Sequence, residues 1–116
     1  MVKNSLIPER ADIVWIDFSP TKGHEQSGLR PAVVISTGKY NSLTGLVIVC
    51  PVTSKQKDYF FEVKIEGSQG GLQKKSFVLA DQIRSFDIKE RVEKITGKVS
   101  ELEINEILAK ASTLFK

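Results

Sequence analysis

The sequence has few of the residues that build disulfide scaffolds and zinc sites. Its 116 residues include one cysteine and one histidine. A single cysteine excludes an internal disulfide bond, which agrees with a reducing cytoplasm. Cys50 lies in the apolar run 46–52, where packing is a more natural role than nucleophilic attack. One cysteine and one histidine also argue against a dedicated zinc site. We therefore expect no bound metal and no other cofactor.

Long apolar runs are missing as well. No stretch approaches the ~20 apolar residues of a membrane-spanning helix. Residues 1–8 lack the long apolar region of a secretory signal. Hydrophobic residues make up 41% and charged residues 27%, which are globular values. The net charge of +3 permits a polyanionic partner without requiring one. We expect one domain over residues 1–116, in the cytoplasm, with no membrane partner.

Short β-rich segments follow one another along most of the chain. Residues 31–35 form a continuous apolar run, which predicts a strand buried on both sides. Residues 60–65 alternate apolar and charged side chains, as in a strand with one wet face. Residues 38–45 carry turn residues. The expected strands are 12–18, 31–35, 46–52, 60–65, 77–80 and 92–99.

The C-terminal residues predict an α-helix. Ser100 can cap its N-terminus, and Glu103 completes a capping box. Apolar residues then recur at helical spacing and form one stripe, which we expect to pack on the sheet. The stripe consists of Ile104, Ile107, Leu108, Ala111, Leu114 and Phe115. Several strands followed by one helix predict a mostly β (α+β) fold, built as a small curved sheet or partial barrel.

The connection 23–31 gathers an imidazole, a carboxylate and a guanidinium. His24, Glu25 and Arg30 could together accept a proton, donate a proton and neutralise a phosphate. Glycine, serine and charged residues are also ordinary in loops, so a solvated hairpin loop is the alternative on composition alone.

The motifs, taken in order, resemble the MazF/PemK (Kid) toxin family. The resemblance spans essentially the whole chain, with Ala11 standing where the family usually has glycine. It is carried by residues 12–18, Pro20, 23–26, Gly28, 30–34, 50–54, 80–85 and the terminal helix.

The resemblance implies an SH3-like partial β-barrel with a C-terminal α-helix, acting as the toxin of a type II toxin–antitoxin system. It implies a homodimer that cuts single-stranded RNA without a metal, leaving 2′,3′-cyclic phosphate and 5′-OH ends. It also implies neutralisation by a cognate MazE/PemI-type antitoxin. The alternative is a toxin of the same fold that binds and poisons DNA gyrase, as CcdB does, because fold alone does not fix function.

The resemblance also implies catalytic residues. Arg30 would stabilise the phosphate, and Thr53 would donate a hydrogen bond to a phosphoryl oxygen. Glu25 is the candidate base and His24 a candidate acid or substrate-binding residue. Leu79 occupies a position where Kid carries a functional arginine, so Kid's full arrangement is not transferred.

RNA binding would draw on stacking rings and on groups that contact bases and phosphates. Trp15, Phe18 and Tyr40 are large rings that we assign mainly to the core. The expected RNA-binding residues are Gln26, Ser54, Lys55, Lys57, Tyr59, Phe60, Asp81 and Gln82.

Overall fold

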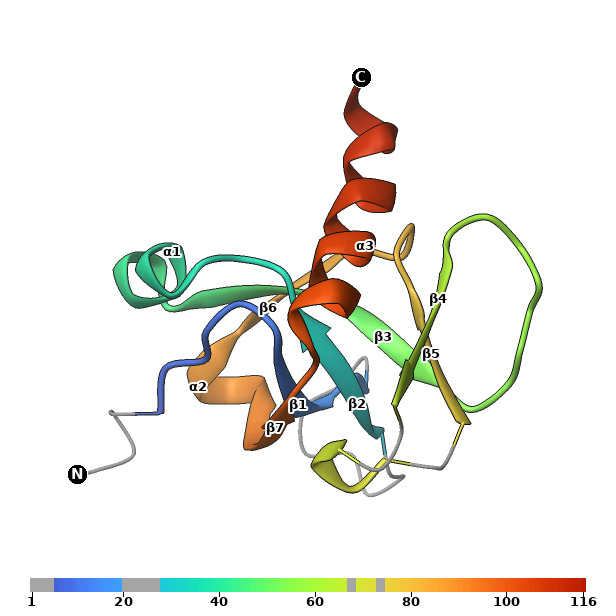
Figure 1. Cartoon of the computed structure of the whole chain (residues 1–116). Coiled ribbons are helices and arrows are strands. Elements are labelled where there is room, and N and C mark those ends of the chain that lie inside the picture. Colours follow the sequence, from blue (N-terminus) through green and yellow to red (C-terminus); the bar gives the residue numbers. More distant parts are fainter. Residues whose placement is uncertain (1–5, 20–27, 67–68, 73–74) are drawn as a thin grey trace.

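The protein folds as one strongly curved antiparallel sheet with a helix at its C-terminal end (Figure 1). This is a computed structural model, and it describes residues 6–19, 28–66, 69–72 and 75–116. Within these residues seven strands pair in the order β4-β5-β3-β2-β1-β7, with β6 pairing with β3 outside this path. The strands are β1 (Asp12–Asp17), β2 (Leu29–Val34), β3 (Leu46–Thr53), β4 (Glu62–Glu66), β5 (Lys75–Leu79), β6 (Arg84–Asp87) and β7 (Val92–Lys98).

Strand β3 holds the sheet together by changing partners along its length. Its first half pairs with β6 up to Val49, and its last two residues, Val52 and Thr53, pair with β5. Pro51 lies in the gap between these two ladders. On its other side Pro51 stays in register with Ala32 of β2. Proline has no backbone N–H to donate, which agrees with an interruption on one side of the strand. The sheet is open, and the predicted partial barrel is the observed form.

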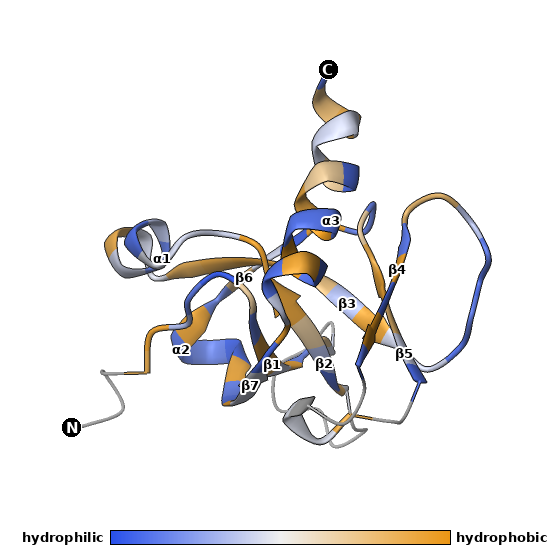
Figure 2. Cartoon of the chain, viewed as in Figure 1, coloured by the Kyte–Doolittle hydropathy of each residue, from blue (hydrophilic) through white to orange (hydrophobic). Residues whose placement is uncertain are grey.

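The second half of strand β2, from Ala32 to Val34, is buried on both faces, as its continuous apolar run predicts. Val33 belongs to one hydrophobic cluster, beneath α3, with Ile13, Cys50 and Val63. Ala32 and Val34 belong to a second cluster on the opposite face of the strand, closed by Phe86 and Ile88. Figure 2 shows the apolar residues concentrated on the strands at the centre of the fold.

Helix α3 (Glu101–Ser112) begins as the sequence predicts. The Ser100 side chain accepts from the Glu103 N–H, and the Glu103 carboxylate accepts from the Ser100 N–H, so the capping box is complete. The apolar stripe is buried at Ile104, Ile107 and Ala111, whereas Leu114 and Phe115 beyond the helix are exposed. The helix then projects away from the body of the protein (Figure 1), and its sequel, the 3₁₀ turn η3 (Thr113–Phe115), leaves Phe115 77% exposed.

Residues 38–45 do not form the predicted turn. They form the short helix α1 (Gly38–Thr44), which Thr37 caps and Gly45 ends. Asn41 in this helix is fully buried: its side chain donates to the Pro8 carbonyl and accepts from the Ser36 hydroxyl. These tertiary bonds hold a sequence of turn-forming residues in a helix.

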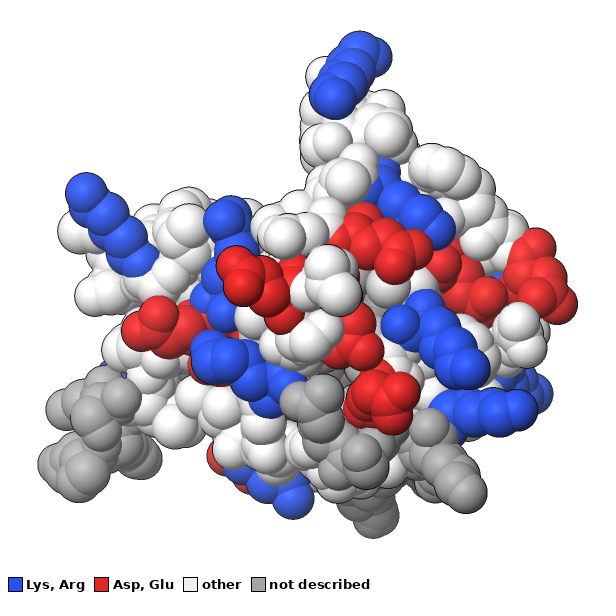
Figure 3. All heavy atoms as spheres, in the orientation of Figure 1, with Lys and Arg blue, Asp and Glu red and all other residues white. Residues whose placement is uncertain are grey.

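Two further elements were not predicted. Strand β6 (Arg84–Asp87) and the single-turn helix α2 (Ile88–Arg91) lie between β5 and β7. Strand β4 begins at Glu62, two residues later than predicted, because Tyr59–Phe61 belong to the turn before it. No helix in the described residues has the length and apolar character needed to cross a membrane. The face seen in Figure 3 carries lysine and arginine interspersed with acidic residues.

Candidate active site

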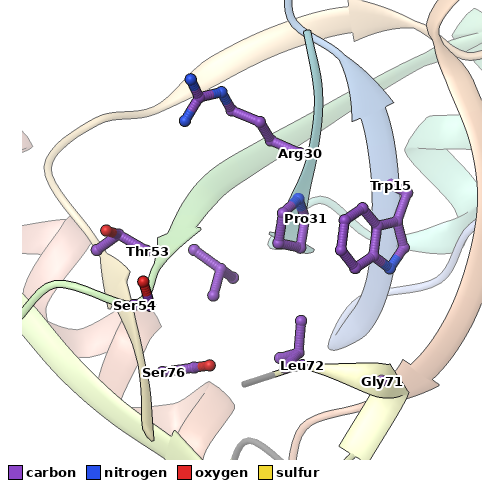
Figure 4. Close-up of a pocket in the computed structure, with 9 residues that line it drawn as sticks. Trp15, Arg30, Pro31, Thr53, Ser54, Gly71, Leu72 and Ser76 are labelled. Atoms are coloured by element: carbon purple, nitrogen blue, oxygen red, sulfur yellow. The ribbon is translucent and has the colours of Figure 1, made fainter. Parts of the chain in front are cut away.

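A cavity of about 260 Å³ lies between strands β1, β2 and β3 and the 3₁₀ turn η2 (Gln69–Gly71) (Figure 4). Three residues singled out from the sequence line the same cavity: Arg30, Thr53 and Ser54. The remaining lining is mostly apolar. Its residues are Trp15, Arg30, Pro31, Val52, Thr53, Ser54, Gly71, Leu72 and Ser76.

Arg30 reaches the cavity from the start of β2, where its backbone is paired with Ile16 of β1. Its side chain is exposed. Within the described residues, no hydrogen bond or ion pair engages the guanidinium. A guanidinium presents five donors in a rigid fork that matches a phosphate. Arg30 therefore places a positive charge beside the cavity, where it is available to bind a phosphate.

Thr53 ends β3, opposite Phe77 of β5. Its hydroxyl oxygen accepts the Lys55 backbone N–H at 3.1 Å, so the turn that follows the strand fixes the side chain. A hydroxyl that accepts one bond still has its own hydrogen to donate. Thr53 can therefore donate to an oxygen atom placed in the cavity.

Trp15 forms one wall of the cavity, a role that we did not assign to it from the sequence. It lies on β1 between Pro31 of β2 and Lys94 of β7. Its indole N–H donates to the Thr96 hydroxyl at 3.2 Å, and the Lys94 ammonium lies 5.6 Å from the ring centroid. A sequence gives no sign that a strand tryptophan faces a cavity rather than the core.

The β3–β4 connection, residues 54–61, is an ordered loop that the light-green trace of Figure 1 shows at the edge of the molecule. The Glu62 carboxylate closes it by accepting the backbone N–H groups of Lys57 and Asp58. Asp58 has a left-handed backbone, with φ of 56°. The loop is hydrophilic over its outer part and apolar near β4 (Figure 2).

The rings of Tyr59 and Phe60 contact the turn after β5 and helix α3, and neither lines the cavity. Tyr59 donates its hydroxyl hydrogen to the Asp81 carboxylate, and Phe60 is 59% exposed with the Lys110 ammonium 5.1 Å from its ring. Partial burial, followed by the hydrogen bond and charge of Asp81, raises the pKa of Tyr59 to about 12. Gln82 is exposed in the turn after β5.

The predicted site residues therefore fall into three groups. Arg30, Thr53 and Ser54 share the cavity. Six others lie outside its lining: Lys55, Lys57, Tyr59, Phe60, Asp81 and Gln82. His24, Glu25 and Gln26 lie outside the described residues.

The chain matches a protein family over nearly its whole length. The model of the family described as "PemK-like, MazF-like toxin of type II toxin-antitoxin system" matches residues 9–115. The chain belongs to this family. It is 40% identical over 108 residues to the endoribonuclease toxin MazF of Escherichia coli K12, covering 93% of this chain and 94% of the relative.

Solved structures of MazF proteins share the fold. The crystal structure of MazF from Deinococcus radiodurans superposes with a TM-score of 0.77 at 39% identity, covering 93% of this chain and 96% of that one. A MazE–MazF crystal structure from the same organism gives a TM-score of 0.78 at 36% identity, covering 93% and 95%. The expected fold and family are both confirmed.

This MazF/PemK-family chain holds the two ends of its β1–β2 connection firmly. The Phe18 N–H donates to the Gly28 carbonyl at 2.8 Å. A Cβ at Gly28 would lie 2.4 Å from the Ser19 hydroxyl oxygen and 2.7 Å from the Ser19 nitrogen, so only glycine fits. Arg91 of α2 donates to the carbonyls of Asp17 and Ser19. Arg91 thus anchors the end of β1, which is paired with the backbone that leads into Arg30.

Cys50 takes no part in the cavity. It is fully buried in the cluster beneath α3, and burial, with a smaller effect of Asp81, raises the pKa of its thiol to about 12. The nucleophilic thiolate is scarce at such a pKa, so Cys50 is a packing residue, as we inferred from its apolar surroundings. In the described residues, no three His, Cys, Asp or Glu side chains cluster in a way that could hold a metal ion.

Proposed function

We propose that this protein is the toxin of a type II toxin–antitoxin pair and an endoribonuclease that cuts single-stranded RNA. The observation that carries the proposal is the shared cavity of Arg30 and Thr53, in a chain of the PemK/MazF toxin family. The E. coli relative at 40% identity is itself named an endoribonuclease toxin.

The proposed reaction is an attack of a ribose 2′-oxygen on the adjacent phosphorus. The new 2′-O–P bond forms, the P–O5′ bond breaks, and the products carry a 2′,3′-cyclic phosphate and a 5′-OH. The 2′-OH proton passes to a base, and the departing 5′-oxygen receives a proton from an acid. Negative charge grows on the phosphoryl oxygens in the transition state and needs cationic or hydrogen-bonding support.

Arg30 and Thr53 are suited to that support. The Arg30 fork would pair with two phosphoryl oxygens, and Thr53 would donate to one of them. Arginine keeps its proton at neutral pH, so charge stabilisation is a more natural task for it than proton donation. Glu25 as the base and His24 as the acid complete the proposal. Both lie outside the described residues.

Other groups would bind the remainder of the RNA. The loop lysines Lys55 and Lys57 are exposed and would contact backbone phosphates. Tyr59 and Phe60 would stack on splayed bases farther along the strand. Gln26, Asp81 and Gln82 remain proposed contacts. We also propose that the protein acts in the cytoplasm as a homodimer, and that a MazE/PemI-type antitoxin neutralises it, as the MazE–MazF structure of a relative supports.

The test is cleavage of a long RNA by the purified protein in the presence of EDTA, with 5′-OH ends mapped. We expect discrete cuts in single-stranded regions. Arg30→Ala and Thr53→Val should each slow cleavage about 100- to 1,000-fold, the usual effect of removing one transition-state donor. Lys39→Ala is the matched control, because Lys39 is an exposed cation on α1 and away from the cavity. Inhibition of gyrase without any RNA cleavage would support the CcdB-like alternative instead.

A further inference from the structure

The cavity beside Arg30 and Thr53 is partly lined by side chains that cannot bind a phosphate. Trp15 presents an aromatic ring there, and Pro31, Val52 and Leu72 add apolar surface. A phosphate group would gain nothing from these side chains, because its oxygens need donors and positive charge. The apolar lining therefore calls for a second, uncharged part of the ligand.

We propose that this cavity is a nucleobase subsite, in which one base of the RNA next to the cleaved linkage stacks on Trp15. The proposal rests on the proposed ribonuclease function of the same site and adds how one base is held there. Aromatic side chains are the usual platforms for unstacked bases in single-stranded RNA. Arg30 and Thr53 at the rim would hold the adjoining phosphate while the base lies inside.

The size of the cavity limits it to one base. Its volume of about 260 Å³ is slightly below the ~300–1,000 Å³ of pockets that enclose drug-sized ligands. The cavity is therefore too small for two stacked nucleotides. The hydroxyl of Ser54, which is exposed in the lining, would meet the edge of the base and make this subsite a determinant of the cleavage sequence.

Trp15 is held in a fixed orientation before any ligand arrives. Its indole N–H donates to Thr96. Its backbone is paired with Pro31 of β2 on one side and Lys94 of β7 on the other. Thr96 is itself confined by Gly70 of η2, where a Cβ would lie 3.0 Å from the threonine hydroxyl oxygen. A preoriented ring loses little conformational entropy on binding, which favours a role in recognition.

The first test uses the fluorescence of Trp15, which is the only tryptophan in the chain. The full-length protein is titrated with a random-sequence hexadeoxynucleotide, which lacks the attacking 2′-OH, and with an abasic hexamer of equal phosphate number. We expect the base-bearing pool to change the emission and the abasic hexamer to leave it largely unchanged. An equal response to both probes would show that only the backbone binds. No response to either would assign the cavity to another occupant, such as a protein side chain. Both of these results would overturn the proposal.

The second test compares cleavage maps of one long RNA. Trp15→Ala should weaken cleavage about 5- to 150-fold, as expected for the loss of one stacked base, and should relax the base preference at one position. Trp15→Phe keeps a ring and should retain the preference. Arg30→Ala should instead lower cleavage at all sites alike. An unchanged preference in a folded Trp15→Ala variant would overturn the subsite. A wild-type protein that does not cut RNA would refute the proposed function, while the fluorescence titration would still decide whether a base binds.

Discussion

Among single residues, Ala11 departs from the family pattern at a position with an unusual backbone conformation. Its backbone φ is 83°, in the left-handed region that glycine favours. The family usually has glycine at this position. Alanine there stores strain, because a Cβ in the left-handed region crowds the carbonyl oxygen that follows it.

Replacing Ala11 with glycine should therefore raise stability. Relief of about 1–2 kcal/mol of backbone strain exceeds the ~0.4–1 kcal/mol of extra unfolded-chain entropy that glycine brings. Ala11→Val should lower stability, since β-branched residues tolerate positive φ poorly. Thermal denaturation of the three proteins measures the order. Ala80→Gly, in which a fully buried alanine loses its methyl group, should be destabilising and serves as the control. A lower melting temperature for Ala11→Gly would contradict the assignment of strain.

Tyr59 gives a prediction about pH. Its folded-state pKa is raised from 10.0 to about 12, first by burial and then by Asp81. The protonated phenol is the form that donates to Asp81, so the stabilisation is complete below pH 10 and is lost as the pH rises through 12.

Spectrophotometric titration of the phenolate checks this shift. In a Tyr40→Phe background Tyr59 is the only tyrosine left, because the chain has two. Its midpoint should exceed 10, and Asp81→Asn should lower it while leaving the part that is due to burial. A midpoint that Asp81→Asn does not move would show that the hydrogen bond is not formed in solution.

At the scale of elements, α3 depends on its N-terminal cap. Ser100→Ala removes the bond to the Glu103 N–H and should cost about 1 kcal/mol, or roughly 4 °C in melting temperature. Ser112→Ala is the matched control, since that hydroxyl only donates to a carbonyl of its own helix. Equal melting temperatures for the two variants would mean that packing on the sheet alone holds the helix.

The helices and strands also show which parts of the fold can be predicted from the sequence. Hydrophobic periodicity and the capping box predicted the core strands and α3, because those signals are local. The helix α1 could not be predicted, since its buried Asn41 is satisfied by Pro8 and Ser36 outside the helix. Arg30 and Thr53 were found through family motifs. Trp15 was missed because its exposure depends on the turn η2, more than 50 positions away in the numbering.

At the scale of the whole molecule, charge sets the response to salt. The net charge is only +3, and the face in Figure 3 mixes both signs. RNA binding should therefore weaken with salt through the few cations that touch phosphates. Log K against log[salt] should fall with a slope of about −0.7 for each phosphate contact on a single strand. Arg30→Ala should reduce the slope by one such contact, as measured with an uncleavable oligonucleotide. A slope unchanged in Arg30→Ala would mean that this arginine does not touch the backbone.

The pairing of β1 with β7 has a consequence for folding during synthesis. The tryptophan wall belongs to the first strand, yet the threonine that steadies it comes 81 positions later. A ribosome must therefore translate most of the message before the pocket can be assembled. We therefore expect a nascent chain that ends before β7 to lack a fixed Trp15 ring, because Thr96 has not yet been added.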